Sequence, residues 1–119
     1  MSDVLNPVQI EQSIRDVANR MAKGVKVCSD TYAAFLQADH AHEVAVARAY
    51  MDHDGPAHEK KYAAIEATQE TRNARDAADV AYRYADRTAR ALDAELRAWQ
   101  SIGASVRSMY GVAGRGEGA

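Results

Sequence analysis

Apolar residues in the second half of the chain recur at alternating steps of three and four residues, and this spacing is the strongest constraint on the fold. The run consists of Tyr82, Ala85, Ala89, Leu92, Leu96, Trp99, Gly103, Val106 and Tyr110. Such spacing places them on one face of an α-helix and is typical of a coiled-coil seam. One helix cannot bury this stripe by itself, so the spacing predicts packing against other helices.

The first half of the chain carries a similar stripe. Its members are Ile10, Ile14, Val17, Met21, Val25, Cys28, Tyr32 and Phe35, followed by the small residues Ala38, Ala41, Ala45 and Ala49. The preceding Asn6-Pro7-Val8-Gln9 predicts a helix start, with Asn6 as N-cap and Gln9 reaching back as in a capping box. Gly24 costs about 1 kcal/mol relative to alanine inside a helix. The sequence therefore leaves undecided whether the helix breaks near Gly24 and forms a separate N-terminal helix.

The segment Asp54-Gly55-Pro56 is the one strong turn signal in the sequence. Its glycine tolerates a left-handed conformation, and its proline cannot continue the preceding helix. It predicts an all-α fold in which two long helices form an antiparallel hairpin.

The polar segment from Thr68 to Asp79 contains no large hydrophobic residue. The second helix therefore either breaks there, giving three helices, or continues as a helix whose polar segment is surrounded by water.

The length of 119 residues suits one small domain. We expect a single helical domain over residues 1–110. The glycine-rich segment 111–119 is expected to be a flexible tail, because burial cannot offset its ordering entropy. Since the seam needs a partner, we expect a homo-oligomer, although alanine-rich seams fit several subunit numbers.

Charge and composition exclude several classes of protein. The chain has 15 Lys and Arg against 17 Asp and Glu, a net charge of −2, so no overall field draws it to nucleic acid or anionic membranes. A single cysteine excludes an internal disulfide and fits a reducing compartment. No stretch approaches the roughly 20 apolar residues that span a bilayer, and no leader pattern opens the chain. We therefore expect a cytoplasmic protein without a membrane partner.

Acid and base residues in the second helix follow a regular order. Asp79 and Arg83, Asp86 and Arg90, and Asp93 and Arg97 form pairs four residues apart. The acid precedes the base each time, which favours ion pairs within a helix. In one interpretation these pairs only keep the helix face soluble. In the other, Arg83, Arg87, Arg90 and Arg97 form a ridge that binds phosphates. Arg87 has no acidic residue four positions before it, and the exposed ion pairs of the other arginines exchange their partners easily. Arg20, Lys23 and Lys26 form a second basic patch, and Lys60 and Lys61 form a third.

Residues that carry out catalysis form no complete pattern. Cys28 lies on the apolar stripe, where a thiol is inert. The histidines are His40, His42, His53 and His58. Asp39 and His42 share a helix face, as in half of a di-iron bundle motif, but a second copy is missing. Phosphate-loop, dinucleotide and zinc-ribbon motifs are also absent. We predict no enzyme, no catalytic residues, no metal site and no cofactor.

Three stretches resemble small helical proteins encoded by phages, especially those of actinobacterial hosts. They read LNPVQIEQSIRDVANRM, AVARAYMDHDGPAHEKKYAAIEAT and AYRYADRTARALDAELRAWQSIGASVR. The same layout resembles the UvsY-type recombination mediators of phages. This resemblance implies an oligomer that binds single-stranded DNA without sequence preference. It further implies that the oligomer helps to load a recombinase onto strands covered by single-strand-binding protein.

Two function classes follow from these observations. In the first, the protein is a recombination mediator whose DNA contacts would come from Lys60, Lys61, Arg83, Arg87, Arg90 and Arg97. In the second, it is a protein-interaction or scaffolding module, of the virion or directed at the host, which does not bind DNA. Its interface would then consist of Leu92, Leu96, Trp99, Ile102, Val106 and Tyr110. Trp99 is the expected hot spot of such an interface.

Overall fold

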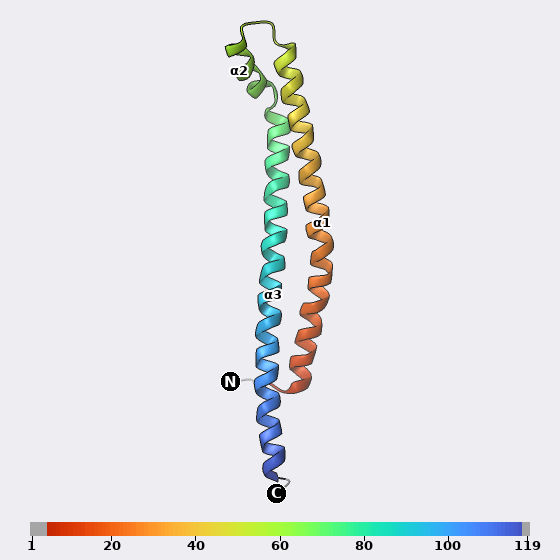
Figure 1. The fold of residues 1–119 in the computed structure, drawn as a ribbon. Coiled ribbons are helices and arrows are strands. Elements are labelled where there is room, and N and C mark those ends of the chain that lie inside the picture. Colours follow the sequence, from red (N-terminus) through yellow and green to blue (C-terminus); the bar gives the residue numbers. More distant parts are fainter. Residues whose placement is uncertain (1–4, 118–119) are drawn as a thin grey trace. The chain divides into compact units, whose positions relative to one another are not determined.

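Three helices make up the regular structure of the described residues, which confirms the all-α prediction (Figure 1). A computed structural model describes residues 5–117, and the side chains of residues 5–111. Helix α1 spans Pro7–Asp52, α2 spans Ala57–Ala67 and α3 spans Gln69–Glu117. Helix α3 therefore includes residues 111–117 of the glycine-rich segment. The mobility expected of that segment stays a prediction, and residues 118 and 119 lie outside the described part.

The start of α1 is the predicted capping box. The backbone N–H of Gln9 donates to Asn6 Oδ1 over 2.9 Å, and the backbone N–H of Asn6 donates to Gln9 Oε1 over 3.2 Å. These two bonds satisfy backbone donors that a helix start leaves free. Beyond this start α1 continues through Gly24 without interruption, so a separate N-terminal helix does not form.

The predicted turn lies between α1 and α2. Helix α1 ends at Asp52 and α2 begins at Ala57. The backbone N–H groups of Glu59 and Lys60 donate to the carbonyl oxygen of Pro56 over 3.0 and 3.2 Å. A Cβ atom at Gly55 would lie 2.8 Å from Glu59 Oε2. A larger residue at position 55 would therefore displace the Glu59 side chain.

Thr68 separates α2 from α3, which answers the question of whether the second long helix breaks. Its backbone angles are φ −115° and ψ 22°, outside the helical region. Its side chain is buried, and Oγ1 donates to the carbonyl oxygen of Ala64 over 2.7 Å. The remaining polar residues, from Gln69 to Asp79, belong to α3. The break is thus confined to a single residue.

The chain divides into two compact units, and unit 1 consists of residues 5–25 and 87–117 within the described part. In this unit the beginning of α1 packs antiparallel to the end of α3 (Figure 1). The Ile10 Cγ2 methyl lies 3.2 Å from the position of a Cβ atom at Gly103. Further along, Arg20 forms an ion pair of 3.1 Å with Glu95. The buried side chains of unit 1 include Ile10, Val17 and Leu92.

Unit 2, Lys26–Asp86, contains the rest of α1, all of α2 and the beginning of α3. Helices α1 and α3 are again antiparallel here. The rings of Tyr32 and Tyr82 lie 5.0 Å apart between their centres. The buried residues are small ones, Ala64, Thr68 and Ala85. Unit 2 therefore has little large-residue core of its own among the described side chains.

The seam predicted for α3 is largely confirmed. Each of its residues from Tyr82 to Val106 is buried or half-buried. Tyr110 is the exception, with 55% of its surface exposed. Since Ile10 lies opposite Gly103 and α1 begins at Pro7, no part of α1 remains to cover Tyr110.

The stripe predicted for α1 is wrong at three positions. Val25, Tyr32 and Ala41 are exposed, and Gly24, Thr31 and His42 take the half-buried places instead. One residue along an α-helix turns the side chain by about 100°. At each of these places the apolar residue lies one step away from the strict alternation of three and four. The inward line of α1 therefore passes through small and polar residues.

Candidate functional site

The arginines predicted to bind DNA are divided between the two units. Arg87, Arg90 and Arg97 belong to unit 1, and Arg83 belongs to unit 2. Arg97 forms an ion pair of 3.0 Å with Asp93, as the four-residue spacing predicts. Arg87 is exposed and makes no ion pair with any residue of the described part. Among the arginines predicted to bind DNA, Arg87 is therefore open to an added phosphate.

The other predicted DNA contacts lie in unit 2. Arg83 pairs with Asp79 over 3.0 Å. The Lys60 ammonium lies 5.7 Å from the centre of the Tyr50 ring, a cation–π distance, and Lys61 is exposed. Of these three residues, only Lys61 contacts neither a carboxylate nor an aromatic ring within the described part.

The two units differ in charge. The sequence segments of unit 1, residues 1–25 and 87–119, carry eight Lys and Arg against six Asp and Glu, a net charge of +2. Unit 2 carries seven against eleven, a net charge of −4. The near-neutral total therefore hides a basic unit and an acidic unit.

The predicted protein interface lies entirely in unit 1, and its residues differ in exposure. Leu92 is buried, and Leu96, Trp99 and Val106 are half-buried. Ile102 and Tyr110 are exposed by 36% and 55%. The first four contribute to the core of unit 1. Only Ile102 and Tyr110 present much apolar surface to a partner.

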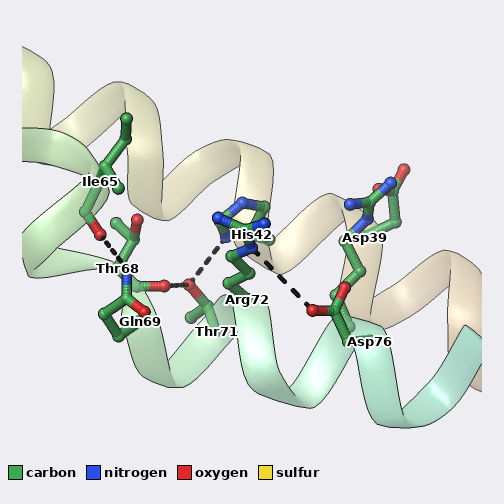
Figure 2. Close-up of polar contacts among 9 residues, drawn as sticks. Asp39, His42, Ile65, Thr68, Gln69, Thr71, Arg72 and Asp76 are labelled. Carbon is green, nitrogen blue, oxygen red and sulfur yellow. Dashed lines mark hydrogen bonds and ion pairs between the residues drawn. The ribbon is translucent and has the colours of Figure 1, made fainter. Parts of the chain in front are cut away.

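A polar cluster occupies the seam of unit 2 near the break at Thr68, and sequence reasoning missed it (Figure 2). The Thr71 hydroxyl donates to the carbonyl oxygen of Thr68 over 3.0 Å. His42 Nδ1, from α1, lies 3.0 Å from the same hydroxyl. In the tautomer with a proton on Nδ1, His42 donates to Thr71 Oγ1, whose own proton goes to Thr68. This network joins α1 to the first turn of α3.

Asp39 and Arg75 extend the cluster along the seam. Arg75 Nε donates to Asp39 Oδ1 over 2.6 Å, and the Arg75 guanidinium lies 6.0 Å from the centre of the Phe35 ring. Both charged side chains are partly exposed, at 40% and 31%. Polar pairs at seam positions fix the register of coiled coils at some cost in stability. A structural role in register is therefore the simplest account of the cluster.

The geometry of the cluster does not favour nucleophilic catalysis. The hydroxyl that contacts His42 is that of Thr71, and it donates its proton to the carbonyl oxygen of Thr68. A base that activates a nucleophile must instead accept that proton. Cys28 is half-buried on the seam. Among the described side chains, no three of His, Cys, Asp or Glu gather in a way that could hold a metal ion.

A shallow groove of about 620 Å³ lies beside the polar cluster on α1. It is lined by His42, Glu43, Val46, Ala47, Tyr50 and Met51. The lining is mostly apolar, and its volume falls within the usual range of ligand and peptide sites. Glu43 makes no ion pair with a described residue. The groove therefore combines an apolar floor with one free carboxylate.

One pKa in unit 2 departs clearly from its usual range. The Lys26 ammonium donates to Asp30 Oδ2 over 2.9 Å. This hydrogen bond, together with the attraction of the carboxylate, raises the pKa of Lys26. Both side chains are largely exposed, so the pair affects the helix surface and not a buried site.

The comparisons with known proteins assign no relative. The chain matches no known protein-family model, no curated protein and no solved structure. Along the described residues, none of the helices combines the length and apolar character needed to cross a membrane.

The sequence did contain a signal for the polar cluster. The alternation of three and four residues continues backwards from Tyr82 through Ala78, Arg75, Thr71, Thr68 and Ala64. Thr71 and Arg75 are polar, so a pattern of apolar residues alone does not mark them as seam positions. The groove had no comparable signal, because it depends on side chains that protrude to different extents.

Proposed function

We propose that this protein is a non-enzymatic helical assembly protein, which acts through protein contacts made by exposed faces of its helices. One observation carries this proposal. Large apolar side chains lie exposed along both long helices, α1 and α3, beside a small buried core in the described part. Association would cover surface that the chain leaves open.

The exposed surface includes many large apolar side chains. Among the described residues, Val8, Val25, Met51, Tyr62, Val80, Tyr84 and Met109 are each at least 66% exposed. By contrast, the buried hydrophobic side chains of the described part are Ile10, Val17, Ala64, Ala85 and Leu92. Single exposed hydrophobic residues are common in proteins. So many beside so small a core favour a protein that is completed by a partner.

The experiment that tests the proposal is the molar mass of the protein in solution as a function of its concentration. We expect the mass to rise above the 13.0 kDa of one chain. The first partner to be found should then be a second copy of the chain. A phage scaffolding or virion role would be one use of such an assembly.

We also propose a second function, binding of single-stranded DNA by the assembled protein, as expected of a UvsY-type recombination mediator. The observation that favours it is Arg87, an exposed cation without an ion pair in the described part of unit 1. The net charge of +2 on the segments of that unit supports it. An assembly repeats weak phosphate contacts along a strand, and such avidity compensates for few contacts per chain. A recombinase and a single-strand-binding protein would be its partners.

For this second function, Arg87→Glu is expected to weaken binding of a labelled single-stranded oligonucleotide. Losing one phosphate contact reduces the slope of log K against log salt by about 0.7. Fluorescence anisotropy at several salt concentrations measures both quantities. The matched control is Arg83→Glu, because Arg83 is already paired with Asp79. If neither variant differs from the unaltered protein, or if nothing binds at low salt, the DNA proposal is abandoned.

A further inference from the structure

The end of α3 has no helix packed against it among the described residues of its own unit. Ile10 lies opposite Gly103, and α1 begins at Pro7. Residues 107–117 of α3 therefore extend past the start of α1, and we call them the C-terminal extension (Figure 1). Two of its side chains are large, apolar and open: Met109 is 70% exposed and Tyr110 is 55% exposed. Covering them would remove apolar surface from water.

The groove on α1 in unit 2 offers a surface of matching chemistry. Its apolar lining includes Val46, Tyr50 and Met51, and Met51 is 77% exposed. Its volume of about 620 Å³ is large enough for more than one side chain. An amphipathic helix laid on such a groove is a common mode of recognition.

Charge selects between the possible occupants of the groove. Glu43, one of its lining residues, is without an ion pair among the described residues, and unit 2 carries a net charge of −4. Two copies that met groove to groove would bring like charges together, which opposes association. The C-terminal extension instead begins with Arg107, which is also without an ion pair in the described part and shares a helix face with Tyr110. The segments of its unit carry +2.

From these observations we infer that the C-terminal extension of one copy docks in the α1 groove of a second copy, with Tyr110 and Met109 against the apolar lining and Arg107 beside Glu43. The contact joins two different surfaces of the same chain. Repeating it produces a ring if the rotation closes and a filament if it does not. This inference rests on the proposed assembly function and names its partner and its surfaces.

The test blocks each surface separately and then mixes the blocked proteins. Tyr110→Glu blocks the extension and leaves the groove intact, and Met51→Lys does the reverse. Each variant alone should remain at the mass of one chain at concentrations where the unaltered protein assembles. A mixture of the two should form a species of twice the monomer mass and nothing larger, because one functional extension meets one functional groove. Sedimentation velocity with a fluorescent label on one variant measures this.

Matched controls exist on surfaces outside the proposed contact. Tyr84→Glu and Val80→Lys make the same kinds of change at side chains that are 74% and 66% exposed on α3 of unit 2. Both should assemble like the unaltered protein. All four substituted positions are exposed, so circular dichroism should show unchanged helix content. The charge pair gives an independent test: Glu43→Arg and Arg107→Glu each weaken assembly, and combining them in one chain restores it.

Three outcomes would overturn the inference. If the unaltered protein assembles and Tyr110→Glu and Met51→Lys assemble equally well, the assembly function stands but uses other surfaces. If the mixture contains only single chains, the two surfaces do not complement each other. If the unaltered protein stays monomeric throughout, the proposed function fails together with the inference.

Discussion

Replacing Leu92 with alanine lowers the free energy of unfolding by about 2–5 kcal/mol. Leu92 is 8% exposed, in the core of unit 1. Its truncation loses the favourable free energy of burying the side-chain methyl groups away from water, and it leaves a cavity. Urea denaturation followed by circular dichroism measures the effect. All proteins should be compared at the same concentration, because association changes apparent stability.

Ile102→Ala is the control for this first prediction. Ile102 lies ten residues further along α3 in the same unit and is 36% exposed. Its truncation should cost much less, about 1 kcal/mol or below. Equal losses for the two variants would mean that Leu92 is not a core residue, or that Ile102 is covered by a second copy. The concentration dependence of the Ile102→Ala effect separates these two explanations.

Replacing Gly103 with leucine is expected to lower the free energy of unfolding by up to about 2 kcal/mol. A Cβ atom at this position lies 3.2 Å from Ile10 Cγ2, so a larger side chain forces α1 and α3 apart in unit 1. Overpacking of this kind costs about 1–3 kcal/mol, and the better helix propensity of leucine returns up to about 1 kcal/mol. Thermal and urea unfolding of the variant measure the net change.

Gly24→Ala is the matched control for the glycine prediction. Nothing lies within 4 Å of a Cβ atom at Gly24, which is also inside a helix of unit 1. Alanine there should stabilise the protein by about 0.5–1 kcal/mol through helix propensity alone. If both substitutions shift stability in the same direction, close contact with Ile10 is not the reason for glycine at position 103.

Local signals predicted much of the fold. The capping box of Asn6 and Gln9, the turn around Gly55, and the α3 seam from Tyr82 to Val106 each depend on residues close in sequence. Helix starts and turns are set by hydrogen bonds over three or four residues, so a single sequence contains the information. The strict spacing of the seam similarly identified the buried face of α3.

Features that depend on packing between helices were not predictable in the same way. Val25 and Tyr32 are more apolar than Gly24 and Thr31, so hydrophobicity alone assigned the wrong neighbours to the α1 seam. The buried positions of α1 follow the regular alternation of three and four residues along the whole helix, and not the most hydrophobic residue of each turn. Arg75 likewise pairs with Asp39 of α1, and no spacing within one helix predicts a contact between residues 36 positions apart. Which exposed faces a partner covers depends on a second molecule.

Sedimentation equilibrium of the full chain, from micromolar concentrations upward, tests the central claim most directly. If the protein acts by assembly, the average mass rises from 13.0 kDa towards multiples of that value as the concentration increases. The rise should be reversible on dilution. A mass that remains at 13.0 kDa at every concentration would contradict the proposal that a second copy covers the exposed apolar surface.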